Sequence, residues 1–314
     1  MPAILEVQNL VKKYGDFAAV KRISFDIKEG EIFSLLGPNG AGKTTTISVL
    51  STLYALTEGD ATVGGHSVSK EPMAVRQLIG VVPQDLAIYD DLTARENLSF
   101  WGQMYGLSGK ALKARIVEVL EQIGLSDKAN NRVKTYSGGM KRRVNIGVGL
   151  LHKPHLLFMD EPTVGIDPQS RRAILDSVKE LNKQGMTVLY TTHYMEEAQE
   201  LSDRVGIIDH GELIALGTQK ELTRQVGEND TLILRVGEGE DAEALAAAVR
   251  ALPGVLQANV TDGAVTLITP EAEEVLAPVV TKANESGVKI RAVEIQEPNL
   301  EAVFLHLTGR ALRD

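Results

Sequence analysis

Alternating apolar and polar positions mark the beginning of the chain. The runs Ile4–Leu10 and Ile23–Ile27 alternate with a period of two, which predicts half-buried antiparallel strands. The segment Glu31–Leu36 then enters a glycine-rich turn, and a helix is predicted over Lys43–Leu50. This order of strand, loop and helix is the one that a phosphate-binding loop requires.

Unbroken apolar runs and longer helices follow. The runs, which predict buried strands, are Leu78–Val82, Leu156–Met159 and Thr187–Tyr190. The predicted helices are those from Thr93 to about Leu125, broken at Gly106–Gly109, and Lys141–Leu151. A closing hairpin is predicted from Arg204–Asp209 and Glu212–Gly217. Unbroken apolar strands separated by helices are typical of a parallel sheet covered on both faces, so the fold class is α/β.

The pattern changes near Val226–Asp230, where we place a domain boundary. The strands predicted beyond it are Thr231–Val236, Gly254–Val260, Ala264–Thr269 and Val288–Ile295. The helices are Glu240–Leu252, Pro270–Ser286 and, at the end, Asn299–Leu307. Up to the last helix, the order is strand, helix, strand, strand, helix, strand. This order predicts a smaller α+β domain of the ferredoxin-like kind.

Composition narrows the classes of function. The chain has 314 residues, 43% of them apolar, a net charge of −9 and no cysteine. The acidic balance disfavours a nucleic-acid partner, and the lack of cysteine excludes disulfides and cysteine-based zinc sites. No signal peptide is recognisable at the N-terminus. No apolar run reaches the roughly 20 residues that span a bilayer, so we expect a membrane role only through a partner.

The glycine-rich turn carries the most specific motif. It fits G-x-x-x-x-G-K-[ST], in which backbone N–H groups form a nest for anionic oxygens. Lys43 is expected to reach the β- and γ-phosphates, and Thr44 to offer its hydroxyl to magnesium. The alternative is a chance turn, which the flanking strand and helix disfavour. The predicted nucleotide-binding residues here are Gly37, Pro38, Asn39, Gly40, Ala41, Gly42, Lys43, Thr44 and Thr45.

Two further motifs carry polar groups. Asp160 and Glu161 follow the apolar run Leu156–Met159, at the strand edge where open α/β sheets bind ligands. There Asp160 can hold magnesium and Glu161 can act as general base, whereas the alternative is a solvated acidic turn. Ser137, Gly138 and Gly139 precede a helix and predict a second anion site. The alternative for these three is an N-capped turn.

Together these motifs resemble the nucleotide-binding subunit of an ABC transporter. Gly37–Thr44 is similar to the Walker A motif of that family and Met159–Pro162 to its Walker B motif. Tyr136–Met140 resembles its LSGGQ signature, with Tyr in place of Leu and Met in place of Gln. The serine and both glycines, which contact phosphate in the family, are retained. Met140, unlike Gln, cannot donate a hydrogen bond.

The resemblance implies roles for four more residues. Gln84 is similar to the Q-loop glutamine that touches magnesium, and His193 to the switch histidine that contacts the γ-phosphate. Tyr14 is similar to the aromatic residue that stacks on adenine, and Asp167 to the D-loop aspartate at the dimer interface. The alternatives are a surface glutamine, a structural histidine and an ordinary strand-end tyrosine.

The resemblance also implies an assembly and a mechanism. Two such domains dimerise head to tail, and each ATP, with magnesium, lies between the phosphate-binding loop of one copy and the signature of the other. The implied fold is an ABC-type P-loop NTPase with a mixed sheet over residues 1–225, with a helical subdomain at about 86–150. The accessory domain would then be residues 230–314, with a regulatory or dimer-stabilising role or, alternatively, a purely stabilising one.

The last helix points to one branch of the family. Glu297–Arg310 resembles the tail of bacterial ATPase subunits that serve a separate multi-span permease and export drugs, lipids or polysaccharides, the daunorubicin-resistance-like branch. We therefore expect an ATP-hydrolysing subunit bound peripherally at the cytoplasmic face of the membrane, with residues 89–107 facing the permease. The alternatives are a non-transport ABC ATPase of DNA repair or the ribosome, and a module that binds ATP without hydrolysis. Glu161 argues against the latter. The transported compound is not readable from this chain.

Overall fold

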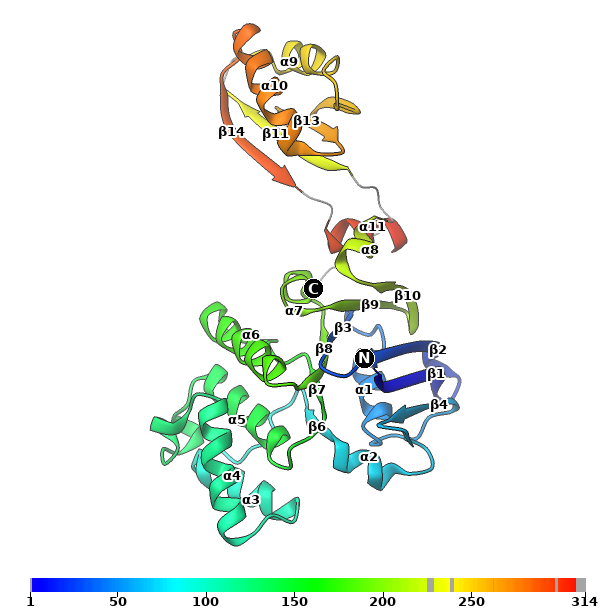
Figure 1. The fold of residues 1–314 in the computed structure, drawn as a ribbon, viewed down its shortest axis with the longest axis vertical. Helices are drawn as coiled ribbons and strands as arrows, with labels where there is room; N and C mark the ends of the chain where they lie inside the picture. Colours follow the sequence, from blue (N-terminus) through cyan, green and yellow to red (C-terminus); the bar gives the residue numbers. More distant parts are fainter. Residues whose placement is uncertain (1, 225–228, 238–239, 262, 297–298, 309–314) are drawn as a thin grey trace. The chain divides into compact units, whose positions relative to one another are not determined.

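The computed structural model describes residues 2–224, 229–237, 240–261, 263–296 and 299–308 (Figure 1). The chain divides into two compact units, residues 1–218 and residues 219–311. The division falls before the predicted boundary near residues 226–230. Residues 226–228 of the predicted boundary, and Glu297, Pro298, Gly309 and Arg310 of the predicted tail, lie outside the described residues.

A six-stranded mixed sheet forms the centre of the first unit. Its order is β10-β9-β3-β8-β7-β6, and only β10 runs antiparallel to its neighbour. The bounds are β3 Ile32–Leu36, β6 Ile79–Val82, β7 Leu156–Asp160, β8 Thr187–Thr192, β9 Arg204–Asp209 and β10 Glu212–Gly217. Every residue of β3, β7 and β8 is buried, as expected for central parallel strands covered on both faces.

A second, antiparallel sheet of the first unit has the order β2-β1-β4-β5. Its bounds are β1 Ala3–Tyr14, β2 Phe17–Lys28, β4 Glu58–Val63 and β5 His66–Ser67. Buried and exposed residues alternate along much of β1 and β2, which therefore place one face on the core. Apolar residues of this sheet and of β3 share one hydrophobic cluster, which anchors the start of the phosphate-binding loop.

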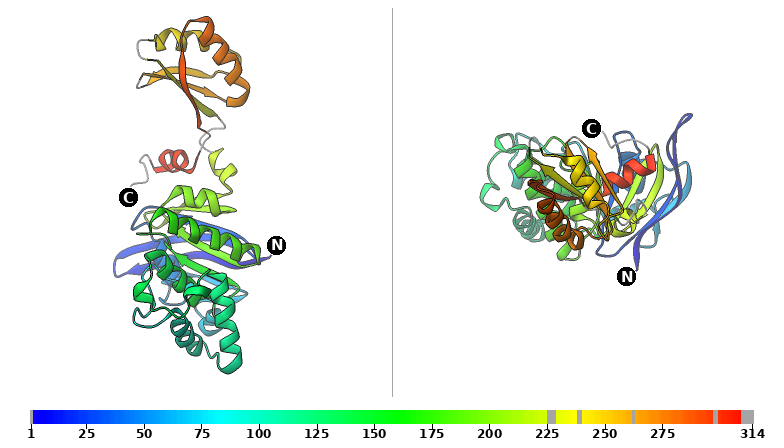
Figure 2. Two further views of the ribbon diagram at one scale, coloured as in Figure 1. Left: turned by 90° about the vertical axis from the view of Figure 1, so that its left-hand side faces the viewer. Right: turned by 90° about the horizontal axis from the view of Figure 1, so that it is seen from above.

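The helices of the first unit are α1 Lys43–Leu50, α2 Pro72–Leu78, α3 Ala94–Met104, α4 Gly109–Gln122, α5 Gly138–Leu150, α6 Pro168–Lys183 and α7 Met195–Leu201. Short 3₁₀ turns occur at Ser126–Lys128 and Val133–Thr135. Thr93 and Glu96 form a capping box that starts α3. Helices α3, α4 and α5 pack together into a helical subdomain (Figures 1 and 2). The predicted mixed sheet with a helical subdomain is confirmed.

The second unit contains α8 Gln219–Thr223, β11 Asp230–Val236, α9 Ala242–Val249, β12 Gln257–Thr261, β13 Ala264–Thr269, α10 Ala272–Glu285, β14 Ile290–Gln296 and α11 Leu300–Thr308. The antiparallel sheet has the order β12-β13-β11-β14. Helices α9 and α10 bury apolar residues of this sheet in one cluster. The predicted order of strands and helices, and with it the α+β class, is confirmed.

Several elements were not predicted, and two of them matter for the site. Helix α6 buries Ile174, Leu175, Val178 and Leu181, a helical spacing that the chain displays plainly. Helix α7 has only seven residues, too few for a clear period. Strands β4 and β5 and helices α2 and α8 were also absent from the prediction. Within the described ranges, no helix is long and apolar enough to cross a membrane.

Candidate nucleotide site

The phosphate-binding loop joins β3 to α1 and buries its lysine. The Lys43 side chain donates hydrogen bonds to the carbonyls of Gly37 (2.6 Å) and Pro38 (2.9 Å) and is 3% exposed. Gly42 precedes α1 with φ of 108°, and a Cβ there would lie 2.6 Å from the carbonyl oxygen of Ala19. Only glycine can therefore occupy this position, which leads the chain into the helix whose N-terminus faces the cavity.

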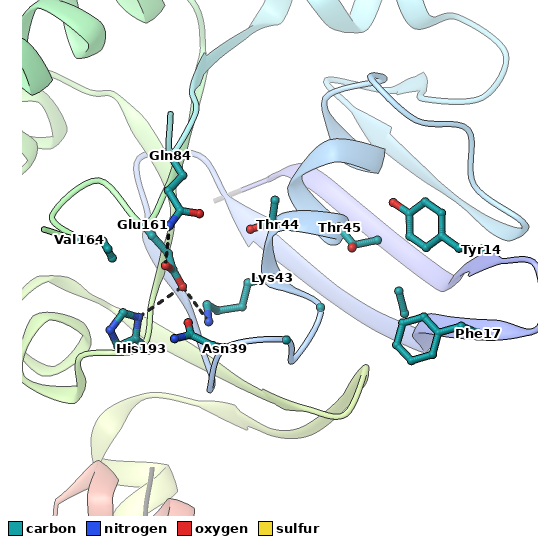
Figure 3. Close-up of a pocket in the computed structure, with 13 residues that line it drawn as sticks. Tyr14, Phe17, Asn39, Lys43, Thr44, Thr45, Gln84, Glu161, Val164 and His193 are labelled. Carbon is teal, nitrogen blue, oxygen red and sulfur yellow. Dashed lines mark hydrogen bonds and ion pairs between the residues drawn. The ribbon is translucent and has the colours of Figure 1, made fainter. Parts of the chain in front are cut away.

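Glu161 lies at the centre of the site. Its Oε1 is 2.9 Å from Lys43 Nζ and 3.4 Å from His193 Nδ1, and its Oε2 is 3.5 Å from Gln84 Nε2 (Figure 3). Glu161 follows β7, has φ of 43°, and donates its backbone N–H to the Thr191 hydroxyl. A left-handed conformation is unfavourable for a residue with a side chain, and such strain is common at functional positions. The structure thus brings together four residues that are distant in the sequence.

A cavity of about 460 Å³ opens around these residues, a volume within the usual range for small-ligand sites. Its lining consists of Tyr14, Phe17, Ala19, Asn39, Gly40, Gly42, Lys43, Thr44, Thr45, Gln84, Glu161, Val164 and His193. Tyr14 and Phe17 are 45% and 66% exposed, and both lie beside the loop in Figure 3. Phe17 was not predicted, because it belongs to no motif and precedes the predicted strand Ile23–Ile27, whereas β2 begins at Phe17.

Asp160 and Thr44 meet next to this cavity. Asp160 is 4% exposed and accepts a hydrogen bond from Thr191 Oγ1 at 2.7 Å, and the nearby Thr44 hydroxyl lowers its pKa. Burial raises the pKa of Asp160; the Thr191 and Thr44 hydrogen bonds oppose this shift, and the nearby Glu161 carboxylate adds to it. A buried carboxylate, a hydroxyl and the Gln84 amide oxygen are hard ligands, so their chemistry fits magnesium.

A complete protein cage for a metal ion is not present in the described part of the chain. No group of three or more His, Cys, Asp or Glu residues is placed to hold a metal ion there. Magnesium bound through only one or two protein groups completes its shell with water and phosphate oxygens. Thr44, Asp160 and Gln84 therefore fit magnesium that arrives with a nucleotide.

The predicted second anion site lies apart from this cavity. Ser137 caps α5 by accepting a hydrogen bond from Met140 N (3.3 Å), and Ser137 and Gly138 are exposed. A Cβ on Gly139 would collide with the side chain of Ser170 at the start of α6. Asp167 caps α6 through the N–H of Ser170, and this bond lowers the pKa of Asp167.

The predicted residues thus form two sets. Tyr14, Asn39, Gly40, Gly42, Lys43, Thr44, Thr45, Gln84, Glu161 and His193 line the cavity. Gly37, Pro38, Ala41, Ser137, Gly138, Gly139, Asp160 and Asp167 do not line it. Of the second set, Gly37 and Pro38 accept hydrogen bonds from Lys43, and Asp160 accepts one from Thr191. The signature residues and Asp167 are not among the residues that line the cavity, so their predicted role stays a prediction.

Comparisons with known proteins agree along the whole chain. Residues 20–164 match the family described as ABC transporter, and residues 217–308 match the family described as ATP-binding protein DrrA1-3-like, C-terminal domain. The linearmycin resistance ATP-binding protein LnrL of Bacillus subtilis (strain 168) is 50% identical over 99% of this chain and 100% of its own length. The doxorubicin resistance ATP-binding protein DrrA of Mycobacterium tuberculosis (strain CDC 1551 / Oshkosh) is 40% identical over 96% of this chain and 92% of its own.

Solved structures add the fold. The ATP-binding cassette MJ0796, solved as a dimer in a post-hydrolysis state with ADP and Pi, superposes with a TM-score of 0.61 at 29% identity. It covers 68% of this chain and 98% of its own length. These comparisons give no support to the alternative of a non-transport ATPase. The chain is therefore a member of the ABC transporter family, as an ATP-binding subunit with ATPase activity.

Proposed function

We propose that this chain hydrolyses ATP to drive export through a separate permease, and that the residues around Glu161 carry the reaction. The observation that supports this most directly is the convergence of Lys43, Gln84, Glu161 and His193 in one cavity. Phosphoryl transfer needs mainly positioning and neutralisation of charge. A lysine, a carboxylate and a histidine within contact distance supply both.

Each residue has a distinct task in this proposal. Lys43 and the loop amides bind the β- and γ-phosphates, while Tyr14 and Phe17 stack on the adenine. Glu161 accepts a proton from the attacking water, which Gln84 helps to orient. His193 donates a hydrogen bond to the γ-phosphate. Magnesium, held by Thr44, Asp160 and Gln84, neutralises phosphate charge when bound.

The signature residues act in a second copy of the chain. Ser137 and Gly138 are exposed at the N-terminus of α5, a 13-residue helix whose positive dipole end favours anions. We propose that they contact the γ-phosphate held by the partner's loop in a head-to-tail homodimer, with Asp167 at the interface. Binding of two shared ATP molecules would then favour the closed dimer, and hydrolysis the open one.

Four exposed apolar side chains that follow Gln84 along the chain belong to the proposed permease-facing surface. These are Leu86, Tyr89, Met104 and Tyr105, which are 40%, 48%, 67% and 41% exposed. They fall in or just before residues 89–107, which directly follow the Q-loop position. A contact there would place the subunit at the cytoplasmic face of the membrane. The second unit would then regulate or stabilise the dimer.

The names of the relatives suggest the transported class. LnrL and DrrA are named for resistance to linearmycin and doxorubicin. We propose that this chain likewise serves export of a drug, within the wider class of drugs, lipids and polysaccharides that its tail predicts.

Reconstitution tests the transport role. The chain is combined in vesicles with the permease encoded beside it, and phosphate release is followed while candidate compounds are added. We expect stimulation by a transported compound and its loss with Met104→Glu. The control is Val117→Glu on α4, which places the same charge at another exposed apolar position (47% exposed). Equal loss in both variants, or stimulation without any permease, would contradict the proposal.

A further inference from the structure

Helix α7 carries a buried carboxylate that none of the proposed roles explains. Glu197 is 2% exposed. Its Oε1 accepts a hydrogen bond from Thr163 Oγ1 at 2.6 Å, and its Oε2 accepts hydrogen bonds from Tyr190 Oη and Thr192 Oγ1, both at 2.9 Å. Three hydroxyl groups from two segments therefore point at one carboxylate.

The three hydroxyls belong to the segments that carry the proposed reacting groups. Thr163 lies two residues after Glu161, and Thr192 directly precedes His193. Thr192 Oγ1 also accepts a hydrogen bond from the backbone N–H of Tyr194 at 2.9 Å. The residues on both sides of His193 are therefore connected to this network. Glu197 is thus bonded to both the loop after β7 and the end of β8.

The segment around the D-loop joins the same network. Arg171 on α6 places Nε 3.7 Å from Glu197 Oε1, an ion pair too long for a hydrogen bond, and its guanidinium lies 4.3 Å from the ring centroid of Tyr194. The network also extends along the backbone toward Asp167, because the carbonyl oxygen of Thr163 accepts a hydrogen bond from the N–H of Ile166. One carboxylate therefore contacts the loop after β7, strand β8 and helix α6.

A charge buried this deeply is costly unless hydrogen bonds and a counter-charge offset it. A carboxylate can accept all three hydrogen bonds, with Thr163 on Oε1 and Tyr190 and Thr192 on Oε2. An amide in its place would present an NH2 group to one side, so the hydroxyl there would have to turn and accept instead. An apolar side chain would fill the same volume more cheaply. The buried Glu197 carboxylate therefore points to a need to orient the groups bonded to it, beyond the filling of volume.

We propose that Glu197 is a positioning residue for ATP hydrolysis. It holds the loop that follows Glu161 against the strand end that carries His193, and so keeps Glu161 and His193 within the observed 3.4 Å of each other. This inference rests on the proposed roles of Glu161 and His193. Displacement of a reacting group by about 1 Å can cost about 100-fold in rate, so a loosened network should lower turnover.

The test compares Glu197→Gln with Glu196→Gln, which removes the same charge from the exposed neighbour on the same helix. The full-length chain is assayed for kcat and KM with ATP, and nucleotide binding is measured by fluorescence titration. For Glu197→Gln we expect kcat per nucleotide-binding site to fall by about 10- to 100-fold with KM changed less than about threefold. Glu196→Gln should match the unaltered chain.

A second pair of variants keeps the test decisive if Glu197→Gln does not fold. Thr163→Val removes one hydroxyl donor at nearly constant shape, whereas Thr163→Ser keeps the donor. We expect Thr163→Val to lower kcat and Thr163→Ser to restore most of it. When the double variant Glu197→Gln with Thr163→Val folds, it should be no slower than Glu197→Gln alone, because both act through one contact.

The outcomes separate this inference from the proposed function. A lower melting temperature with unchanged kcat per binding site in Glu197→Gln, or an unchanged kcat in Thr163→Val, would show that Glu197 only stabilises the fold. Glu161→Gln is measured in parallel. Undiminished turnover in that variant would refute the proposed role of Glu161 itself, whereas loss in Glu161→Gln alone would refute only the positioning role of Glu197.

Discussion

The first unit contains two glycine-rich motifs that end at a helix N-terminus, and they differ in what surrounds them. The loop before α1 is enclosed by its own chain: Lys43 is 3% exposed and is bonded to Gly37, Pro38 and Glu161. The turn before α5 is open, with Ser137 and Gly138 exposed. A glycine-rich turn before a helix thus lines a cavity in one place and is exposed in the other.

The difference shows which half of the proposed site the chain can complete alone. A buried lysine needs hydrogen-bond acceptors, and Gly37, Pro38 and Glu161 supply them to Lys43. The open turn is capped by Ser137, and its residues are not among those that line the cavity. We infer that the first motif determines ATP binding by a single copy, and that the second contributes only when another copy supplies the nucleotide.

The largest effect is expected for Glu161→Gln. This change keeps the size of the side chain but removes the proton acceptor, so turnover should fall by about 10²- to 10⁴-fold while ATP still binds. Phosphate release and nucleotide titration measure the two properties. In the presence of ATP the variant should also accumulate as a dimer in gel filtration. A normal turnover would show that the Glu161 carboxylate, at the enclosed phosphate-binding loop, is not needed for hydrolysis.

Gly138→Asp probes the open side. A Cβ at Gly138 meets only Ile166 Cδ1, at an ordinary 3.6 Å, so the monomer should fold normally. The added carboxylate would face the partner's phosphate, and like-charge repulsion should reduce turnover by about 100-fold without changing ATP affinity of the monomer. The matched neutral variant Gly138→Asn should lose much less. Equal losses in the two variants would indicate a steric effect instead of a charge effect.

Asp160→Asn, next to the enclosed phosphate-binding loop, should change turnover and stability in opposite directions. Turnover should fall by about 10- to 100-fold, because the carboxylate proposed to bind magnesium is lost. Burial raises the pKa of Asp160 above its ordinary 3.8, so ionisation of Asp160 destabilises the folded chain at neutral pH. The variant should therefore melt at a higher temperature than the unaltered chain at pH 7. This gain should shrink as the pH falls through the raised pKa and vanish below about 3.8. A gain that grows on acidification would contradict the assignment.

The smallest effect is expected for Phe17→Ala at the rim of the cavity. Loss of one stacking surface on adenine should raise KM for ATP by about 2- to 10-fold and leave kcat nearly unchanged. Steady-state kinetics with Leu53→Ala as control, another exposed apolar residue (68% exposed) outside the cavity lining, checks this expectation. Unchanged KM in Phe17→Ala would remove this residue from the adenine site.

Much of the candidate nucleotide site could be predicted from the sequence, because its residues lie in local motifs. The phosphate-binding loop is contiguous, so its spacing alone predicted the buried Lys43 and the start of α1. Glu197 was not readable. Glu196 and Glu197 both occupy the acidic first turn of α7, and only contacts with Thr163, Tyr190 and Thr192 decide which one is buried. Phe17 escaped notice for a similar reason, since the cavity beside it forms only when β2 pairs with β1.

Mixing two defective variants tests the shared site most directly. Lys43→Ala should lose ATP binding, and Gly138→Asp should lose only its signature function, so each should be inactive alone. In a head-to-tail dimer of one copy of each, one site retains both intact halves. Equal mixing with free exchange should therefore restore about a quarter of the unaltered turnover. If the mixture stays as inactive as its components, although exchange is shown by tagged copies, each site is completed within one chain and the account is wrong.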